Sequence, residues 1–365
     1  MSDLVAQFKN FMANFEKGQL IGVDIGLSSV KVALLSKGKR NSYKLENYAS
    51  IPLSEAAIIE DEIQKPEEII EALAQALDAA KIKPRICNLG MNGPNTMTKR
   101  LQVPDGSRDE VEDNILCESE QYIPFGADES EVDFAILGKL EEDDVVDVVV
   151  AAAKVSVIET YIEYLKEAGL IVKKVDLNVF AINNLFELIV DKDLENISDL
   201  GSIIIDFGAQ TTTVLVYKDG GPILSKEIPV GGVLVTEEIQ RQMGVSYEEA
   251  EDLKTSGDEN GNLPEEIVAI IQSQIQNQMS ELRKVLNFFI AAGSSEQVGF
   301  CYVTGGSSRL PGLMNALQEI IGIEPKLLNP FDVIDYDKKV FDTESVQSIA
   351  ATGAVAMGLG LRTAQ

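Results

Sequence analysis

The sequence has no histidine and no tryptophan, and only three of its 365 residues are cysteine. Without histidine, the chain cannot form a histidine-dependent catalytic triad or zinc site. The cysteines are odd in number and lack metal-ligand spacing, so we expect reduced thiols in the core at Cys87, Cys117 and Cys301. No apolar run reaches the ~20 residues that span a bilayer, and no signal peptide is visible. These absences predict a cytoplasmic protein.

Positive charge is also scarce. The chain has 31 lysine and arginine residues against 59 aspartate and glutamate residues, a net charge of -28. This charge repels nucleic-acid phosphates and anionic lipid, so we expect no nucleic-acid partner. Most of the acidity is expected on a solvated surface, with a dedicated basic partner as the alternative. A chain of 365 residues, 45% of them hydrophobic, exceeds what one core usually holds and predicts two domains.

Residues 202–220 form the pattern around which the rest of the chain can be arranged. The apolar run Ile203–Ile205 ends in Asp206, Gly208 allows a tight turn, and a second apolar run leads to another turn at 219–220. This sequence predicts a β-hairpin. Its backbone N–H groups, threonine hydroxyls and carboxylate would converge in a way that suits phosphate and Mg²⁺. Taken alone, the pattern also fits an ordinary turn between two strands.

Residues 20–35 repeat this pattern. An apolar run is followed by an aspartate, a glycine, two serines and a lysine, namely Asp24, Gly26, Ser28, Ser29 and Lys31. Two such hairpins far apart in the chain predict two related domains that face each other across a cleft. In that arrangement Asp24 and Asp206 would hold Mg²⁺ while Lys31 neutralises phosphate charge. Coincidence between two ordinary hairpins is the alternative.

A third pattern occupies residues 300–311. A predicted strand runs into Gly305-Gly306, and Ser307 and Ser308 then open a helix. Two glycines without Cβ atoms would let the backbone approach a flat ring closely. A plain strand-to-helix loop is the alternative for this segment alone. The three patterns in this order favour a nucleotide cleft.

These motifs resemble the actin-like nucleotide-binding superfamily, which includes actin, sugar kinases, DnaK-type chaperones and FtsA. Within it, the chain resembles the PilM family of type IV pilus assembly proteins in four further segments, Gln121–Phe125, Glu131–Leu137, Ala250–Lys254 and Ala356–Arg362. The resemblance implies an α/β, actin-like ATPase fold, with two related domains around a nucleotide cleft and an inserted subdomain 1C of the FtsA/PilM type. It also implies ATP and Mg²⁺ as cofactors.

The resemblance assigns roles to individual residues in that cleft. The ATP phosphates would be bound by Gly26, Leu27, Ser28, Ser29, Lys31, Gly208, Ala209, Gln210 and Thr211. Adenosine would be bound by Glu251, Lys254, Gly305, Gly306, Ser307 and Arg309, and the metal by Asp24 and Asp206. For Glu251 and Lys254, a solvated ion pair on a surface helix is the alternative.

The same resemblance predicts the domain boundaries. Residues 1–18 are expected to form an N-terminal amphipathic helix that packs on the protein itself or contacts a membrane or partner. Domain I (1A) would comprise 19–84, 170–200 and 340–365, with subdomain 1C inserted at 85–169. Domain II would comprise 201–240 with 297–339 (2A) and 241–296 (2B). Expected helices include 66–80, 108–122, 236–243, 265–292 and 353–361.

No general base is evident in the sequence. Asn183 and Asn184 lie where the superfamily has its connecting helix, which carries a water-orienting glutamine in actin. Without a carboxylate or glutamine there, we expect at most slow ATP hydrolysis. The same absence argues against a sugar kinase.

By resemblance, the function is that of an ATP-binding adaptor of the type IV pilus inner-membrane assembly platform. Its expected partner is the cytoplasmic N-terminal tail of PilN, which would recruit it to the inner face of the inner membrane, with other platform or motor proteins beside it. The tail is expected to bind with micromolar affinity near Arg100, Val103, Tyr122, Ile123 and Phe125. The alternatives are an FtsA-like membrane-recruited filament protein, a type II secretion platform domain and a sugar kinase; self-association is also open.

Overall fold

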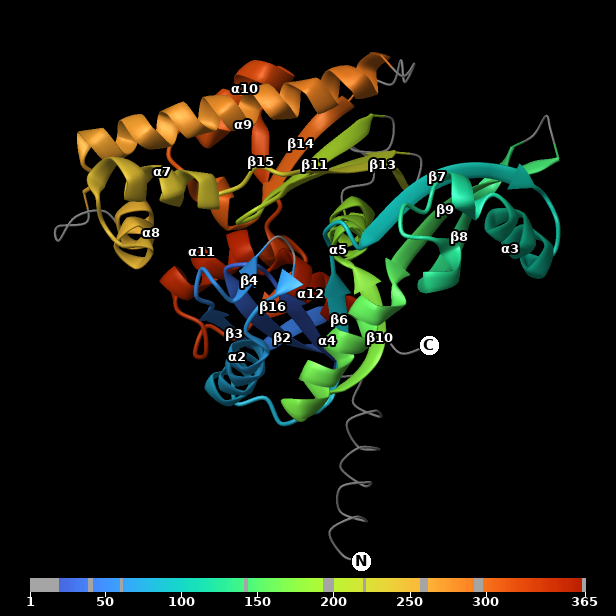
Figure 1. The fold of residues 1–365 in the computed structure, drawn as a ribbon, viewed down its shortest axis with the longest axis horizontal. Helices are drawn as coiled ribbons and strands as arrows, with labels where there is room; N and C mark the ends of the chain where they lie inside the picture. Colours follow the sequence, from blue (N-terminus) through green and yellow to red (C-terminus); the bar gives the residue numbers. More distant parts are fainter. Residues whose placement is uncertain are drawn as a thin grey trace, which may run out of the picture.

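Two mixed β-sheets form the core of the fold, and a smaller antiparallel sheet stands beside them (Figure 1). The computed structural model of the protein describes residues 20–38, 42–59, 62–140, 144–192, 200–218, 221–256, 262–291 and 298–362. The amphipathic helix predicted over residues 1–18 and the turn predicted at 219–220 lie outside these ranges.

The first sheet has six strands in the order β10-β6-β1-β2-β3-β16. These strands are β1 (Leu20–Ile25), β2 (Ser29–Lys37), β3 (Tyr43–Pro52), β6 (Ile86–Met91), β10 (Ile171–Leu177) and β16 (Ile334–Tyr336). Strand β1 pairs antiparallel with β2 and parallel with β6. The hairpin predicted from residues 20–35 is therefore confirmed, and Asp24 lies near the carboxyl end of β1.

The second sheet repeats the central order of the first. Its order is β13-β12-β11-β14-β15, with β11 (Gly201–Phe207), β12 (Thr212–Lys218), β13 (Gly221–Ile228), β14 (Val298–Thr304) and β15 (Pro325–Leu327). Strand β11 pairs antiparallel with β12 and parallel with β14. The order β6-β1-β2-β3 thus recurs as β14-β11-β12-β13, and Asp206 lies near the end of β11 as Asp24 does in β1. This repeat confirms the pairing of the two sequence motifs.

The helices packed on the first sheet are α2 (Pro66–Ala79), α4 (Val155–Glu167), α5 (Asn178–Lys192) and α12 (Ala354–Leu361), and α11 (Thr343–Thr352) contacts α12 and the end of β14. Helix α12 lies very close to β1 and α5. A Cβ atom on Gly22 would be 1.8 Å from the Ala356 carbonyl oxygen, and one on Gly358 would be 1.9 Å from the Ala181 carbonyl oxygen. Glycine at these two positions therefore lets the backbones meet directly.

The second sheet is covered by α9 (Glu265–Ala291) and α10 (Leu313–Ile321), and α7 (Val233–Met243) and α8 (Tyr247–Thr255) lie at one end of α9 (Figure 1). Gly244 ends α7 with a φ of 68°, and the Ser246 side chain caps α8 through the Glu249 N–H. Helix α7 begins at Val233, three residues before the predicted start. No helix within the described ranges is long and apolar enough to cross a membrane.

The third sheet belongs to a separate small unit, called the module below. It has the order β7-β9-β8 and comprises β7 (Thr96–Pro104), β8 (Ser130–Leu140) and β9 (Val145–Lys154), with α3 (Arg108–Cys117) and the short helices η2 (Ser119–Gln121) and η3 (Ala127–Glu129). Its core includes Val103, Val111, Ile115 and Phe134. Helix α3 ends at Cys117, earlier than the predicted end at 122. Cys117 is exposed, so the prediction of a core thiol is wrong there, whereas Cys87 and Cys301 are buried as expected. Helix α3 buries only one face, which carries Val111 and Ile115.

The sheet pairing differs from the predicted boundaries at two places. Strand β6 pairs with β1 in the first sheet, so the three-stranded module spans 96–154 within the predicted 85–169. Strand β16 pairs with β3, so residues 334–336 also join the first sheet although they were expected in domain II. A strand's own residues give its exposed and buried faces but do not specify its neighbour, which explains both differences.

The module also contacts the second sheet. The hydroxyls of Thr98 on β7 and Ser225 on β13 share a hydrogen bond. The Gly93 N–H donates to Glu227 Oε1 at 3.4 Å. The module, together with the turn that leads into it, therefore contacts the second sheet. The remaining short elements are β4 (Ile58–Ile59), β5 (Glu62–Ile63), η4 (Gly306–Arg309) and η5 (Pro330–Asp332).

Candidate functional site

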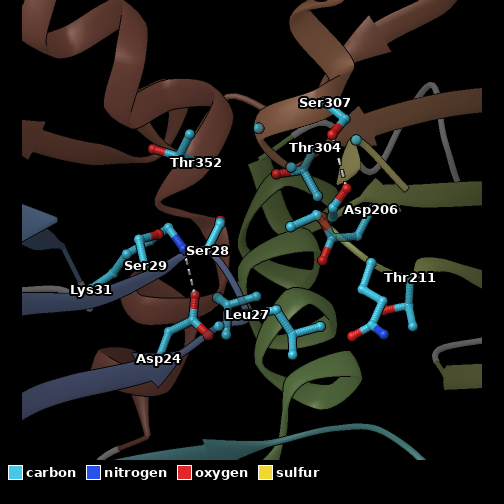
Figure 2. Close-up of a pocket in the computed structure, with 18 of the residues that line it drawn as sticks. Asp24, Leu27, Ser28, Ser29, Lys31, Asp206, Thr211, Thr304, Ser307 and Thr352 are labelled. Atoms are coloured by element: carbon cyan, nitrogen blue, oxygen red, sulfur yellow. Dashed lines mark hydrogen bonds and ion pairs between the residues drawn. The ribbon is translucent and has the colours of Figure 1, made fainter. Parts of the chain in front are cut away.

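A cavity of about 400 Å³ lies between the two hairpins (Figure 2). Every residue predicted to bind phosphate, adenosine or metal lines it: Asp24, Gly26, Leu27, Ser28, Ser29, Lys31, Asp206, Gly208, Ala209, Gln210, Thr211, Glu251, Lys254, Gly305, Gly306, Ser307 and Arg309. These residues come from four separate stretches of sequence. The fold thus brings the three sequence patterns to one place.

The turn between β11 and β12 lines this cavity, and hydrogen bonds fix two of its peptide groups. The Gly208 carbonyl accepts hydrogen bonds from the Gly232 N–H (3.1 Å) and the Ser307 hydroxyl (2.8 Å), and the Ala209 carbonyl accepts from the Val233 N–H (2.8 Å). In a trans peptide the C=O and the following N–H point in opposite directions. The N–H groups of Ala209 and Gln210 therefore point away from α7, which makes the turn a suitable cradle for an anion.

The turn between β1 and β2 is the matching wall of the cavity. The Gly26 N–H donates to the Ser29 carbonyl at 3.0 Å, which closes a loop with Leu27 and Ser28 at its tip. Lys31 lies on the next strand and extends its Nζ to within 3.4 Å of Asp24 Oδ2 (Figure 2). The hydroxyls of Ser28 and Ser29 and the ammonium of Lys31 thus lie across the cavity from the turn between β11 and β12.

Two of the carboxylates that line the cavity, Asp24 and Asp206, share one nearby cation, Lys31. Burial, and then the charge of Asp24, raises the pKa of Asp206 to about 7. The pKa of Lys31 is also raised. Burial lowers this pKa, but the neighbouring negative groups, Asp24 first among them, outweigh the effect of burial. A second cation would relieve the repulsion between the carboxylates.

Mg²⁺ fits this donor set. Mg²⁺ commonly takes one or two protein carboxylates and completes its octahedral shell with water and substrate phosphate oxygens. Among the described residues there is no cluster of three or more side chains that would form a full protein cage for a metal. Asp24 and Asp206 beside an anion cradle are the arrangement expected for a metal that arrives with phosphate.

The predicted adenosine side of the cavity is formed by η4 and α8. Gly305 has a φ of +90°, and a Cβ atom there would lie 2.3 Å from Asp206 Oδ1 and from the Phe207 carbonyl oxygen. Only glycine therefore fits at this position. Glu251 and Lys254 lie on α8 and form an ion pair, with Lys254 Nζ 2.6 Å from Glu251 Oε2.

Some lining residues were missed from the sequence. Tyr247 lies one helical turn before Glu251 on α8, and burial raises its pKa to about 12. Its i, i+4 spacing from Glu251 could have revealed it. Tyr48 and Thr352 also line the cavity, and their hydroxyls lie 3.4 Å apart. They come from β3 and α11, and no local pattern marks them.

Helix α5 presents Asn178, Val179 and Ile182 to the cavity. Asn183 and Asn184, which the sequence suggested at this place, line a different groove. Among the described lining residues, the only carboxylates are Asp24, Asp206 and Glu251. The first two are the candidate metal ligands and the third is paired with Lys254, so the cavity offers no separate carboxylate as a general base.

A second groove of about 630 Å³ separates the module from the first sheet. Strand β8 is an edge of the module's sheet and β10 is an edge of the first sheet, in the part of the chain that the structure describes. Both strands line the groove, together with α5 and apolar side chains that include Leu137, Val149, Ala151, Ile158 and Phe180. Edge strands can pair with an added strand.

The five residues predicted for partner contact lie on the module, and none of them lines this groove. Val103 and Ile123 are buried, with 6% and 4% of their surface exposed. The Tyr122 hydroxyl donates to the Ile115 carbonyl, and Arg100 Nε donates to both Asp147 carboxylate oxygens at 2.9 and 2.7 Å. Phe125 is half-buried. Four of the five therefore serve the module's own structure, and their contact with a partner stays a prediction.

The repeated sheets and the cleft between their hairpins define the actin-like ATPase fold. Residues 22–364 match the family described as Type IV pilus assembly protein PilM, and the chain belongs to that family. The resemblance found in the sequence is therefore confirmed.

Similar structures and sequences agree with this assignment. A PilM-PilN type IV pilus biogenesis complex has a TM-score of 0.82 and 27% sequence identity, with 94% of this chain and 98% of that chain covered. FtsA of Bacillus subtilis is 21% identical over 359 residues, covering 85% of this chain and 78% of FtsA. FtsA of Enterococcus hirae is 24% identical over 223 residues, covering 52% of this chain and 48% of that protein. The chain thus matches about half the length of the latter relative.

Proposed function

We propose that the protein is a Mg-ATP-binding adaptor of type IV pilus assembly that holds the N-terminal tail of a PilN-type protein. The observation that carries this proposal is the presence of two separate sites, a cavity with an anion cradle between the hairpins and a groove between two edge strands. The similarity to a structure described as a PilM-PilN complex supports the choice of partner. The tail would recruit the protein to the inner face of the inner membrane.

In the cavity, the chain's own groups would bind and orient ATP. The N–H groups of Ala209 and Gln210 and the hydroxyls of Ser28 and Ser29 would receive phosphate oxygens, and Lys31 would neutralise part of their charge. Asp24 and Asp206 would hold Mg²⁺. When bound, this ion would supply positive charge that offsets the negative charge of the two carboxylates and the phosphates. Adenosine would lie between η4 and α8.

ATP would act mainly as a ligand. Since the cavity presents no separate carboxylate base, we expect turnover far below the ~10 s⁻¹ of a median enzyme. Phosphate release from the purified protein at saturating Mg-ATP measures this directly, and a rate near that median would show that a catalytic group has been overlooked.

In the groove, the tail would bind as an added strand. The side chains of Glu131, Asp133, Ala135 and Leu137 alternate along β8 and all line the groove, so they share one face of the strand. A bound strand could pair its backbone with the edge of β8 or β10 and place alternate apolar side chains on the floor formed by Ala151 and Phe180. Ordering a flexible tail costs a few kcal/mol, which predicts micromolar affinity.

The test is a fluorescence polarisation titration of a PilN-type N-terminal peptide. An Ala135→Trp change should fill the groove and weaken binding about 10-fold or more. The matched control is Ile136→Trp on the same strand, because Ile136 is 45% exposed and does not line the groove. Phe125→Ala tests the turn that the sequence suggested.

No binding to the unmodified protein would defeat the proposed partner. Equal binding to the protein and to its Ala135→Trp variant would keep the partner but exclude the groove. Loss of binding in Phe125→Ala with no effect of Ala135→Trp would place the peptide at the module's turn instead.

A further inference from the structure

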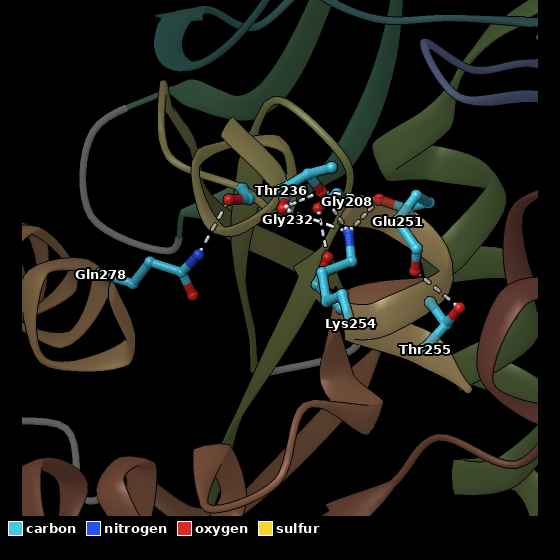
Figure 3. Close-up of polar contacts among 9 residues, drawn as sticks. Gly208, Gly232, Thr236, Glu251, Lys254, Thr255 and Gln278 are labelled. Atoms are coloured by element: carbon cyan, nitrogen blue, oxygen red, sulfur yellow. Dashed lines mark hydrogen bonds and ion pairs between the residues drawn. The ribbon is translucent and has the colours of Figure 1, made fainter. Parts of the chain in front are cut away.

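The ammonium group of Lys254 is fully engaged inside the protein (Figure 3). Its Nζ donates to the Gly232 carbonyl at 3.2 Å, to the Thr236 hydroxyl at 2.8 Å and to Glu251 Oε2 at 2.6 Å. A lysine ammonium has three N–H donors, so these acceptors use all of them. The side chain is only 9% exposed. Lys254 therefore lines the cavity without a free donor for a nucleotide.

The acceptor Gly232 connects Lys254 to the second phosphate turn. The Gly232 N–H donates to the Gly208 carbonyl, and the neighbouring Val233 N–H donates to the Ala209 carbonyl. These two bonds fix the peptide groups whose N–H groups, those of Ala209 and Gln210, point away from α7. A displacement of Gly232 would thus be passed directly to the anion cradle.

Gln278 holds the same segment from the other side. It projects from α9 toward the 231–232 turn (Figure 3), and its Nε2 donates to the Gly231 carbonyl at 3.0 Å. Gln278 is 2% exposed and does not line the cavity, so it cannot touch a ligand there. Gly231 packs tightly on the turn, since a Cβ atom on it would lie 2.3 Å from the Ala209 carbonyl oxygen.

We propose that Lys254 and Gln278 are positioning residues, which fix the 231–232 segment and through it the second phosphate turn. Lys254 acts from α8 and Gln278 from α9, so the turn is held between two helices of the second domain. This inference rests on the proposed nucleotide site, but it assigns Lys254 a different role from the direct adenosine contact expected from the sequence. Both residues then affect phosphate binding without touching phosphate.

The test compares Lys254→Met and Gln278→Met with a matched control, Gln276→Met, because Gln276 lies on the same helix as Gln278 but is exposed. Each variant is titrated with Mg-ATP, with Mg-tripolyphosphate, which has no nucleoside, and with adenosine, which has no phosphate. Hydrogen exchange of the Gly208, Gly232 and Val233 amides in the ligand-free protein gives a readout that needs no ligand.

If Lys254 and Gln278 position the turn, both variants should bind Mg-ATP and Mg-tripolyphosphate about 10-fold more weakly, as expected for loss of a supporting contact. Adenosine affinity should stay unchanged in Gln278→Met, and the three amides should exchange faster in both variants. The Gln276→Met control should match the unmodified protein in every measurement.

Two results would overturn the inference. Weaker adenosine binding by Lys254→Met, with tripolyphosphate binding and exchange unchanged, would show a direct nucleoside contact. Unchanged exchange and unchanged tripolyphosphate affinity in Gln278→Met would show that the 231–232 segment needs no such support. Failure of the unmodified protein to bind any of the three ligands would instead refute the proposed nucleotide site, and the exchange measurement would still decide whether the two residues hold the turn.

Discussion

At the scale of single residues, the cavity concentrates negative charge that the folded protein does not neutralise. Asp206 and Asp24 approach each other from the ends of two strands, and the nearest cation, Lys31, is paired with Asp24. The pKa of Asp206 is about 7 in the folded protein and about 4 in an unfolded chain. The site is thus built for a ligand at a cost in stability.

The first prediction concerns that cost. Because folding raises the Asp206 pKa, deprotonation opposes folding from about pH 4 upward and in full above pH 7. Asp206→Asn should therefore stabilise the ligand-free protein in EDTA by about 1–3 kcal/mol at pH 8, and this gain should shrink as the pH falls toward 4. Urea denaturation across this pH range measures it, and a gain that is constant with pH would contradict the assignment of the shift to Asp206.

The second prediction is that the same change impairs function. Asp206→Asn should weaken Mg-ATP binding about 10- to 100-fold, because a metal-orienting carboxylate is lost. The control is Asp335→Asn, an exposed aspartate on β16 that does not line the cavity. Calorimetry that finds equal Mg-ATP affinity in the Asp206→Asn variant and the unmodified protein would remove Asp206 from the site.

At the scale of elements, α12 joins strand β1 to helix α5 through backbone contact. Its glycines differ in what surrounds them: a Cβ atom on Gly358 would meet the Ala181 carbonyl oxygen at 1.9 Å, whereas one on Gly360 would meet the end of the Leu35 side chain at 3.0 Å. A carbonyl in a helix cannot move aside as a side chain can. The two positions therefore form a natural pair for comparison.

The third prediction uses this pair. Gly358→Ala should destabilise the protein by about 1–3 kcal/mol, since overpacking must shift α12 or α5. Gly360→Ala should have a much smaller effect, because the gain in helix propensity of about 1 kcal/mol offsets a movement of Leu35. Denaturant midpoints of the two variants test this, and equal midpoints would mean that α12 does not lie on Ala181 as described.

The sequence predicted elements better than their partners. Each hairpin could be predicted from its own stretch of sequence. The apolar run, the aspartate, the glycine and the second apolar run all lie within about twenty residues. The placement of β6 and β16 in the first sheet depends on partners distant in sequence, and no local pattern encodes that choice. For the same reason Ile123 could be read as an exposed contact although it is buried, with 4% of its surface exposed. The predicted residues that line the cavity each sit on a local motif, whereas Tyr48 and Thr352, which also line it, do not.

At the scale of the whole molecule, the two proposed sites share a wall. Asp206 on β11 is opposite Thr213 on β12, which is opposite Glu227 on β13. Pro222 of β13 lines the groove, and Glu227 accepts a hydrogen bond from the Gly93 N–H beside the module.

A net charge of -28 gives the molecule no attraction to anionic lipid. Under the proposed function, a protein partner in the groove would bring the chain to the membrane.

The most direct test of this two-site account is hydrogen exchange of the full chain with Mg-ATP and with a PilN-type peptide, each added alone. Mg-ATP should slow exchange in segments 24–31, 206–211 and 304–309, and the peptide should slow exchange in 131–137 and 174–177, where the edge strands face the groove. Protection of the hairpin turns by the peptide with 131–137 unchanged, or no protection of either hairpin by Mg-ATP, would contradict the account.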